Sequence, residues 1–257
     1  MLKAILLDLD GTVYKGKTAI AGANETMRKL REKYKLFFVT NAATRSRIGV
    51  VEKLAGMGIE AKENEMYSTT YAGGRYIAKN YPGKTVFCIG EKGMKDELGK
   101  HGIIIAEDDS AEIVLVGLDR TIDYKKLSIG YRAIEKGAEF IATNEDVVYP
   151  VEDGFLPGAG AIVSAVESCT RKTPFIIGKP KTYFAELINE EEKLDKNEMI
   201  IVGDRLDTDI QFAKNTGITS VLVLTGVTKK EDVEKSKVTP DYVIESINEL
   251  PGLLEKI

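Results

Sequence analysis

Two acidic segments of the sequence each follow a short apolar run, and together they could carry chemistry. Asp8 and Asp10 follow the apolar residues 4–7, and a second apolar run far along the chain leads into Asp204 and Asp209. Carboxylates at the end of a buried strand cost free energy unless a partner offsets their charge. Open α/β sheets place their ligand sites at the carboxyl ends of parallel strands. The pattern therefore predicts one acidic site that needs a cation.

The charge of such a site constrains what can bind in it. At a separation of about 4 Å and an effective dielectric constant of about 20, each pair of like charges costs on the order of 4 kcal/mol. A divalent cation, a lysine, or both must offset this repulsion. Ligands that are all oxygen atoms suit Mg²⁺ better than a softer metal. The structural alternative is that these aspartates are helix N-caps, which are common after strands in α/β proteins.

A cation held by carboxylates at strand ends usually serves phosphate, and the sequence offers the groups that phosphoryl transfer requires. Asp8 could attack phosphorus, and Asp10 could protonate the leaving alcohol and later activate water. The transferring group needs its oxygens neutralised. Thr40 and Asn41 follow one further predicted strand, and Lys179 follows another. Four strand ends with complementary groups favour a phosphate site over four unrelated turns.

Composition excludes several other classes of function. The chain has 257 residues, of which 43% are hydrophobic and 30% charged, and its net charge is −4. This balance is typical of a globular protein and does not favour a nucleic-acid-binding one. Acidic residues interrupt the N-terminal apolar run, so it does not resemble a secretory signal, and no apolar stretch approaches a membrane span. We expect a cytoplasmic protein without nucleic-acid or membrane partners.

The remaining reactive residues favour structural roles. His101 is the only histidine, which argues against a Ser-His-Asp triad and against a metal site built from several histidines. Its Gly-Lys-His-Gly context indicates a helix end. Cys88 and Cys169 lie far apart in apolar surroundings, and we expect both to be buried free thiols. Residues 158–160 (Gly-Ala-Gly) lack the third glycine of a dinucleotide-binding loop, which favours a turn into a helix.

Short apolar runs alternate with amphipathic stretches throughout, which predicts an α/β fold with a doubly wound, mostly parallel sheet. The predicted strands are residues 3–9, 36–40, 85–90, 112–118, 139–143, 174–178, 198–203, 219–224 and 241–245. The predicted helices are residues 24–34, 46–57, 123–136, 159–171, 182–192 and 208–216. Gly58, Gly137 and Gly217 lie where left-handed C-terminal caps are expected.

This number of strands exceeds what one compact sheet of this length usually needs, so we expect a second domain. Turn-forming residues mark breaks near Tyr81-Pro82-Gly83 and Lys172-Thr173-Pro174. The expected division is a main domain of residues 1–81 and 174–257 with residues 82–173 as an α/β insert. Both acidic clusters would then share one sheet.

Four motifs in this order resemble those of haloacid dehalogenase (HAD) superfamily phosphatases: D-L-D-G-T at residue 8, T-N at 40, G-K-P at 178 and G-D-x-x-x-T-D at 203. Residues 143–146 and the segment from Asp153 to Gly160 are similar to the p-nitrophenyl phosphatase or NagD-like branch. The resemblance implies a Rossmann-like catalytic core with an α/β cap inserted between the second and third motifs. It also implies a possible homodimer through the cap.

The resemblance also implies roles for individual residues. Asp8 would be the nucleophile, Asp10 the acid/base, and Lys179 the cation that stabilises the transferring group. Asp10, Thr40, Asn41 and Lys179 would bind the substrate's phosphate.

The same resemblance implies a metal site. Mg²⁺ would be held by Asp8, the backbone carbonyl of Asp10 and Asp204, while Asp209 would orient a water molecule or Lys179.

Together these features predict a Mg²⁺-dependent phosphomonoester hydrolase that acts on a small phosphorylated metabolite through an aspartyl-phosphate. The alternatives are a phosphotransferase or phosphomutase on the same core, or a non-catalytic phosphometabolite-binding protein. The motifs leave the natural substrate open. The resemblance further implies that the loop of Asn144, Glu145 and Asp146 could face the acidic site from the insert and influence specificity, with a solvated polar loop as the alternative.

Overall fold

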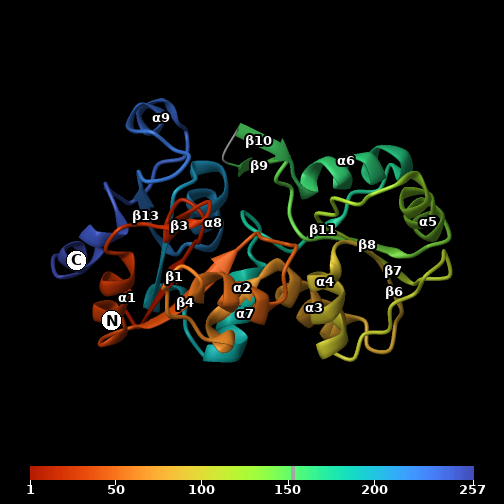
Figure 1. Cartoon of the computed structure of the whole chain (residues 1–257), viewed down its shortest axis with the longest axis horizontal. Coiled ribbons are helices and arrows are strands. Elements are labelled where there is room, and N and C mark those ends of the chain that lie inside the picture. The colour runs from red at the N-terminus through yellow and green to blue at the C-terminus, as the bar shows by residue number, and fades with distance from the viewer. Residues whose placement is uncertain (152–153) are drawn as a thin grey trace. The chain divides into compact units, whose positions relative to one another are not determined.

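The computed structural model describes residues 1–151 and 154–257 (Figure 1). Asp153, the first residue of the segment 153–160 that resembles the NagD-like branch, therefore lies outside the described residues. The larger sheet has the strand order β14-β13-β12-β1-β4-β5. Its strands are β1 (Ala4–Leu7), β4 (Lys35–Thr40), β5 (Met66–Ser68), β12 (Met199–Gly203), β13 (Thr219–Val223) and β14 (Tyr242–Ile244). The hairpin β2 (Tyr14–Lys15) and β3 (Thr18–Ala19) follows β1 along the chain.

The register of the larger sheet brings distant strand ends together. β1 runs parallel to both β4 and β12, with Leu7 opposite Phe38 on one side and Val202 on the other. All four residues of β1 are buried. β1 therefore lies between β4, which follows it in the chain, and β12, which comes from the C-terminal part. The order of the strands reverses at this point. Such a switch point is where open α/β sheets bind ligands.

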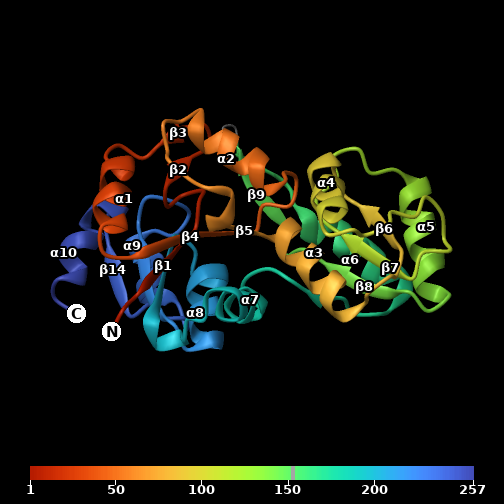
Figure 2. The same cartoon turned by 90° about the horizontal axis from the view of Figure 1, so that it is seen from below.

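Helices accompany the larger sheet, as expected for a parallel sheet that is buried on both faces. α1 packs against β4 and α10, and both chain termini lie in this part of the molecule (Figure 2). The helices are α1 (Ala23–Arg31), α2 (Arg47–Ala55), α7 (Tyr183–Glu192), α8 (Gln211–Thr216), α9 (Lys230–Lys235) and α10 (Leu250–Leu254). The short helical turns are η1 (Glu63–Glu65), η2 (Lys196–Glu198), the π-helical η3 (Leu206–Ile210) and η4 (Ile247–Glu249).

A second parallel sheet has the order β11-β8-β7-β6, with α5 and α6 on one face and α3 and α4 on the other (Figure 1). Val114 and Val116 pack in the cluster that contains α5 and α6 residues, whereas a methyl of Leu115 lies 3.8 Å from the Cβ position of Gly73 in α3. Because alternate residues face opposite sides, both faces of β7 are buried. The elements are α3 (Thr69–Asn80), β6 (Val86–Ile89), α4 (Lys92–Lys100), β7 (Ile113–Val116), α5 (Tyr124–Glu135), β8 (Glu139–Ala142), α6 (Ala159–Thr170) and β11 (Phe175–Ile176).

The described residues cluster into two compact units whose boundaries differ from the expected ones. Unit 1 comprises Met1–Thr40, Val51–Tyr67 and Lys179–Ile257, and unit 2 comprises Asn41–Val50 and Ser68–Gly178. β11 pairs with β8, so the strand predicted at 174–178 joins the second sheet and not the main one. At the other break, α3 packs against α4. The turn-forming residues near 82 and 173 therefore mark loops inside unit 2.

The predicted α/β class with parallel sheets is confirmed, and each of the nine predicted strands overlaps an observed one. Gly58, Gly137 and Gly217 have positive φ angles, and His101 is the C-cap of α4, as expected. Cys88 is buried, but Cys169 is exposed. The expectation for Cys169 was wrong because it lies off the buried stripe of α6, which consists of Ala159, Gly160, Val163, Val166 and Thr170.

The sequence prediction missed four helices, one strand and two antiparallel pairs. It omitted α3, α4, α9, α10, β5, the pair β2 and β3, and the pair β9 (Val148–Val151) and β10 (Gly154–Pro157). Glycines interrupt the helical pattern of α3 and α4, and the β9–β10 pair is largely exposed, so neither carries a clear hydrophobic period. Across the described residues, none of the helices has the length and apolar character needed to cross a bilayer.

Candidate active site

The buried ammonium of Lys179 lies at the centre of the site in unit 1. Its Nζ donates hydrogen bonds to Oδ1 of Asp8 at 2.7 Å, Oδ1 of Asp209 at 2.6 Å and the carbonyl of Val39 at 2.8 Å. The side chain is only 2% exposed. These three acceptors match the three donors of an ammonium group. Lys179 is therefore held rigidly between the end of β1, the end of β4 and the turn η3.

Burial and charge act in opposite directions on this cation. Burial alone would lower the pKa of Lys179, but the carboxylates of Asp209 and Asp8 outweigh it and raise the pKa above its usual range. For Asp8, burial raises the pKa, the Lys179 ammonium opposes the rise, and the charge of Asp209 adds to it. Lys179 is thus cationic, and it offsets only part of the cost of burying a charge on Asp8.

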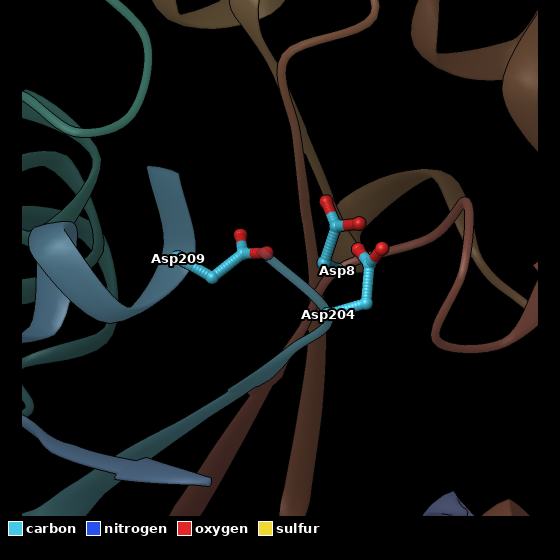
Figure 3. A group of neighbouring side chains, drawn as sticks. All are labelled: Asp8, Asp204 and Asp209. Carbon is cyan, nitrogen blue, oxygen red and sulfur yellow. The ribbon is translucent and has the colours of Figure 1, made fainter. Parts of the chain in front are cut away.

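Asp8, Asp204 and Asp209 come together although two of them lie about 200 residues from the first along the chain. Each offers a carboxylate oxygen, and these three oxygens lie within 4.8 Å of one another (Figure 3). Burial, and then the charges of Asp209 and Asp8, raise the pKa of Asp204. One ammonium faces three carboxylates, so the cluster is under-compensated. An all-oxygen donor set with residual negative charge fits Mg²⁺.

Asp209 has a more restricted environment than the other two. Its Oδ1 accepts from Lys179, and its Oδ2 accepts from the backbone amide of Arg205 at 3.1 Å. Arg205 is the N-cap of the π-helical turn that contains Asp209. The helix N-cap alternative therefore fails for Asp204 and Asp209, and it fails for Asp8 because the next element after β1 is a strand.

Asp10 follows Asp8 by two residues, is half-buried, and is not one of the three clustered carboxylates. Its Oδ1 accepts from the amide of Gly16 in the β2–β3 hairpin at 3.4 Å. Burial raises the pKa of Asp10, while the Gly16 amide and the charge of Lys53 act in the other direction. A carboxyl group with a raised pKa that remains accessible to solvent is suited to transfer protons.

The chain passes from unit 1 to unit 2 between Thr40 and Asn41. Thr40 is the buried last residue of β4, and Asn41 is the first residue of unit 2. Nδ2 of Asn41 donates to Oδ2 of Asp146 at 3.0 Å, and its backbone carbonyl accepts from Asn144 at 2.8 Å and from Oγ1 of Thr69 at 3.2 Å. The segment that follows Thr40 is therefore fixed by residues of unit 2.

Asn144 differs from its expected role. It is 3% exposed, donates to the carbonyl of Asn41, and accepts from the amide of Asp146 at 3.0 Å. It is thus a buried structural residue, because its amide satisfies backbone groups that would otherwise lack partners. The solvated-loop alternative is therefore wrong for Asn144, and for this residue we now expect a structural role in place of substrate contact. Asp146 is half-buried, and Glu145 is exposed.

The sequence prediction missed a loop that contacts the cluster. Residues 224–228 follow β13, and the amide of Val227 donates to Oδ2 of Asp204 at 2.6 Å. A signal was present, since this loop is a further strand end of the same sheet and carries Gly226.

Comparison with known proteins links the site to one family. A family model described as haloacid dehalogenase-like hydrolase matches residues 5–104, and a second, HAD-hydrolase-like, matches residues 176–250. The first range contains Asp8 and Thr40, and the second contains Lys179 and Asp204. The residues that meet in the structure are therefore within the matched ranges.

Full-length relatives agree with this match. An acid sugar phosphatase from Staphylococcus saprophyticus is 40% identical over 99% of this chain and 98% of its own length. The solved structure of a p-nitrophenyl phosphatase from Archaeoglobus fulgidus has a TM-score of 0.93 and 36% identity, covering 98% of this chain and 99% of that one. A glycerol phosphate phosphatase from Mycobacterium tuberculosis in complex with magnesium has a TM-score of 0.90 and 30% identity, covering 97% and 76%.

Proposed function

The chain belongs to the haloacid dehalogenase-like hydrolases and is a phosphatase of that family, and on this premise we propose that it hydrolyses small phosphomonoesters through a covalent aspartyl-phosphate on Asp8. The family inferred from the four sequence motifs is thereby confirmed. The observation that carries the mechanism is the position of Asp8, which is hydrogen-bonded to the Lys179 ammonium and lies within a few ångströms of Asp204.

In the proposed reaction, a carboxylate oxygen of Asp8 attacks phosphorus and the bond to the ester oxygen breaks. Asp10 donates a proton to the leaving alcohol, which its raised pKa favours. Water then attacks the phosphorus of the aspartyl-phosphate while Asp10 accepts its proton, which releases phosphate and restores Asp8. Lys179 neutralises charge on the transferring group. Thr40 and Asn41 would bind the phosphate oxygens from the end of β4.

We assign Mg²⁺ as the cofactor, held by Asp8, the backbone carbonyl of Asp10 and Asp204. When bound it would supply positive charge that offsets the carboxylates and the phosphate dianion. The under-compensated oxygen cluster supports this assignment, as does the magnesium complex of the Mycobacterium tuberculosis relative. Asp209 would hold Lys179 in place, because both of its carboxylate oxygens already accept hydrogen bonds.

The names of the relatives support a sugar phosphate, or a polyol phosphate of similar size, as the substrate. Unit 2 would be the cap that contacts the part of the substrate beyond the phosphate, and dimerisation through it is a prediction that light scattering can test. A phosphotransferase or phosphomutase would use the same residues. A non-catalytic binding protein would have no need of a nucleophile paired with a buried lysine.

The test is a rate assay with p-nitrophenyl phosphate and a panel of sugar phosphates. We expect phosphate release that stops in EDTA and returns with Mg²⁺, and a radiolabelled, acid-stable and base-labile adduct after rapid quenching. Adding sugar or alcohol acceptors separates the alternatives, since a transferase would yield phosphorylated acceptors. Full activity in well-equilibrated EDTA would overturn the metal assignment, and activity without an adduct would favour direct attack by water.

A further inference from the structure

The loop after β13, residues 224–228, makes several contacts with the two strand ends that carry the acidic cluster. The amide of Val227 donates to Oδ2 of Asp204 at 2.6 Å, and the amide of Thr228 donates to the Asp204 carbonyl at 3.3 Å. Oγ1 of Thr225 donates to the carbonyl of Gly11 at 2.5 Å. The loop therefore connects the end of β12 to the turn that follows β1.

Two glycines leave Asp204 little room to rotate. A Cβ atom at Gly226 would lie 1.9 Å from Oδ2 of Asp204, and one at Gly11 would lie 2.5 Å from the same oxygen. Gly11 also has a φ of +86°, which an L side chain rarely adopts. The carboxylate of Asp204 is thus enclosed by the backbone of both segments, and any added side chain at either glycine would displace it.

This enclosure distinguishes the two oxygens of Asp204. Oδ2 receives the Val227 amide, a charge-assisted hydrogen bond that favours the ionised form. Among the described contacts, Oδ1 accepts no hydrogen bond, and it is not one of the fully buried atoms that lack a partner. A carboxylate with one oxygen fixed by a backbone amide and the other open to a ligand is oriented to bind a cation.

We propose that Thr225, Gly226 and Val227 are positioning residues that hold Asp204 in the orientation required to bind the divalent cation. The inference rests on the proposed function, because it assumes that Asp204 is a metal ligand. None of the three residues touches the substrate or the metal in this proposal. The loop acts through a backbone amide, a hydroxyl and the space left by a missing side chain.

The experiment measures Mg²⁺ binding by isothermal titration calorimetry for the wild type, Gly226→Ala, Thr225→Val and Gly252→Ala. Gly252 is the matched control, since a Cβ there has nothing within 4 Å. We expect Gly226→Ala to weaken Mg²⁺ binding by about tenfold or more, and Thr225→Val by less. The Mg²⁺ concentration that gives half-maximal activity should rise in parallel. KM for p-nitrophenyl phosphate at saturating Mg²⁺ should change little.

The outcomes separate this inference from the proposed function. Absence of Mg²⁺ binding by the wild type would remove the metal assignment and with it the positioning role. Normal Mg²⁺ affinity in both loop variants, with an active and Mg²⁺-dependent wild type, would overturn the positioning role alone. If Gly226→Ala does not fold, Thr225→Val decides, because it removes one hydroxyl and keeps the side-chain shape. A fall in kcat with unchanged Mg²⁺ affinity would also count against the proposal.

Discussion

Nζ of Lys179 lies 2.7 Å from Oδ1 of Asp8, although 171 positions separate the two residues in the chain. The contact exists because Asp8 extends β1 by one residue, with its amide bonded to the Val202 carbonyl at 2.9 Å, and because Lys179 is also held by Asp209. A cation thus lies beside the proposed nucleophile and is held there by the protein's own residues. This preorganisation is what electrostatic stabilisation of a phosphoryl transition state requires.

Asp8→Asn should abolish turnover and keep the fold. The amide has nearly the shape of the carboxylate but cannot act as the nucleophile, so kcat should fall by about 10³-fold or more. Circular dichroism and kcat for p-nitrophenyl phosphate measure the two effects. Asp96→Asn, on exposed α4 surface, is the control and should behave as the wild type. Substantial residual turnover, after deamidation is excluded by mass spectrometry, would rule out a nucleophilic Asp8.

Asp10→Asn should slow the second half-reaction more than the first with a good leaving group. p-Nitrophenolate departs with little acid assistance, whereas attack by water still needs a base. Rapid-mixing absorbance should therefore show a burst of nitrophenolate followed by a slow steady state. With an alkyl phosphate both steps should be slow. A variant that slows good and poor leaving groups equally and gives no burst would contradict the acid/base role.

Lys179→Met should affect both stability and activity. Removing the ammonium leaves Asp8 and Asp209 buried without their shared partner, which should lower the free energy of unfolding by about 3–5 kcal/mol in the absence of metal. kcat should fall by about 10²–10³-fold. Urea unfolding and steady-state kinetics measure these changes.

The double variant Lys179→Met/Asp209→Asn should recover part of the stability and none of the activity, because only the charge imbalance is relieved. Simple additivity in the double-mutant cycle would argue against a shared buried network.

The metal-free protein should lose stability as pH rises from about 4 to about 8. Asp8 and Asp204 have pKa values raised by burial, so above about pH 4 the folded state retains protons that the unfolded chain releases. Their unfavourable contribution is absent below the unfolded pKa and complete above the raised folded pKa. The pKa of Lys179 is raised, so its stabilising contribution stays complete below its unfolded pKa of about 10.4.

The measurement is urea unfolding in EDTA between about pH 5 and about pH 8. The wild type should lose more stability over this range than Asp204→Asn, which has one titrating carboxyl fewer. Mg²⁺ added at the higher pH should restore stability to the wild type and do much less for the variant. Parallel pH profiles for the two proteins would show that the Asp204 pKa is not raised on folding.

Asn144→Ala should destabilise the protein and reduce activity by a similar factor for all substrates. It removes the donor to the Asn41 carbonyl and the acceptor for the Asp146 amide, which should cost about 1–3 kcal/mol. Glu135→Ala, at an exposed position of α5, is the control for stability. Asp146→Ala tests the remaining specificity role, since it removes the carboxylate that accepts a hydrogen bond from the Asn41 side-chain amide. A change in substrate preference in Asn144→Ala, without loss of stability, would restore the specificity role for that residue.

Local pattern determined much of this protein. Apolar runs of strand length followed by Asp8, Thr40 and Asp204 identify buried parallel strands with polar ends, and the geometry of such sheets brings those ends to one edge. Nine of the strands, the α/β class and the left-handed glycines Gly58, Gly137 and Gly217 follow from patterns that neighbouring residues specify. The family was recognised by the resemblance of four short motifs.

Only the tertiary structure decided the relationships that depend on distant contacts. Pairing of β11 with β8 assigns residues 175–176 to the second sheet. The sequence of neither strand indicates which strand it pairs with. Asn144 looks like a polar loop residue until the Asn41 carbonyl is placed against it. Gly226 looks like an ordinary turn glycine until Asp204 occupies the space beside it. Each of these roles comes from a close approach between segments far apart in the chain, and periodicity carries no information about such an approach.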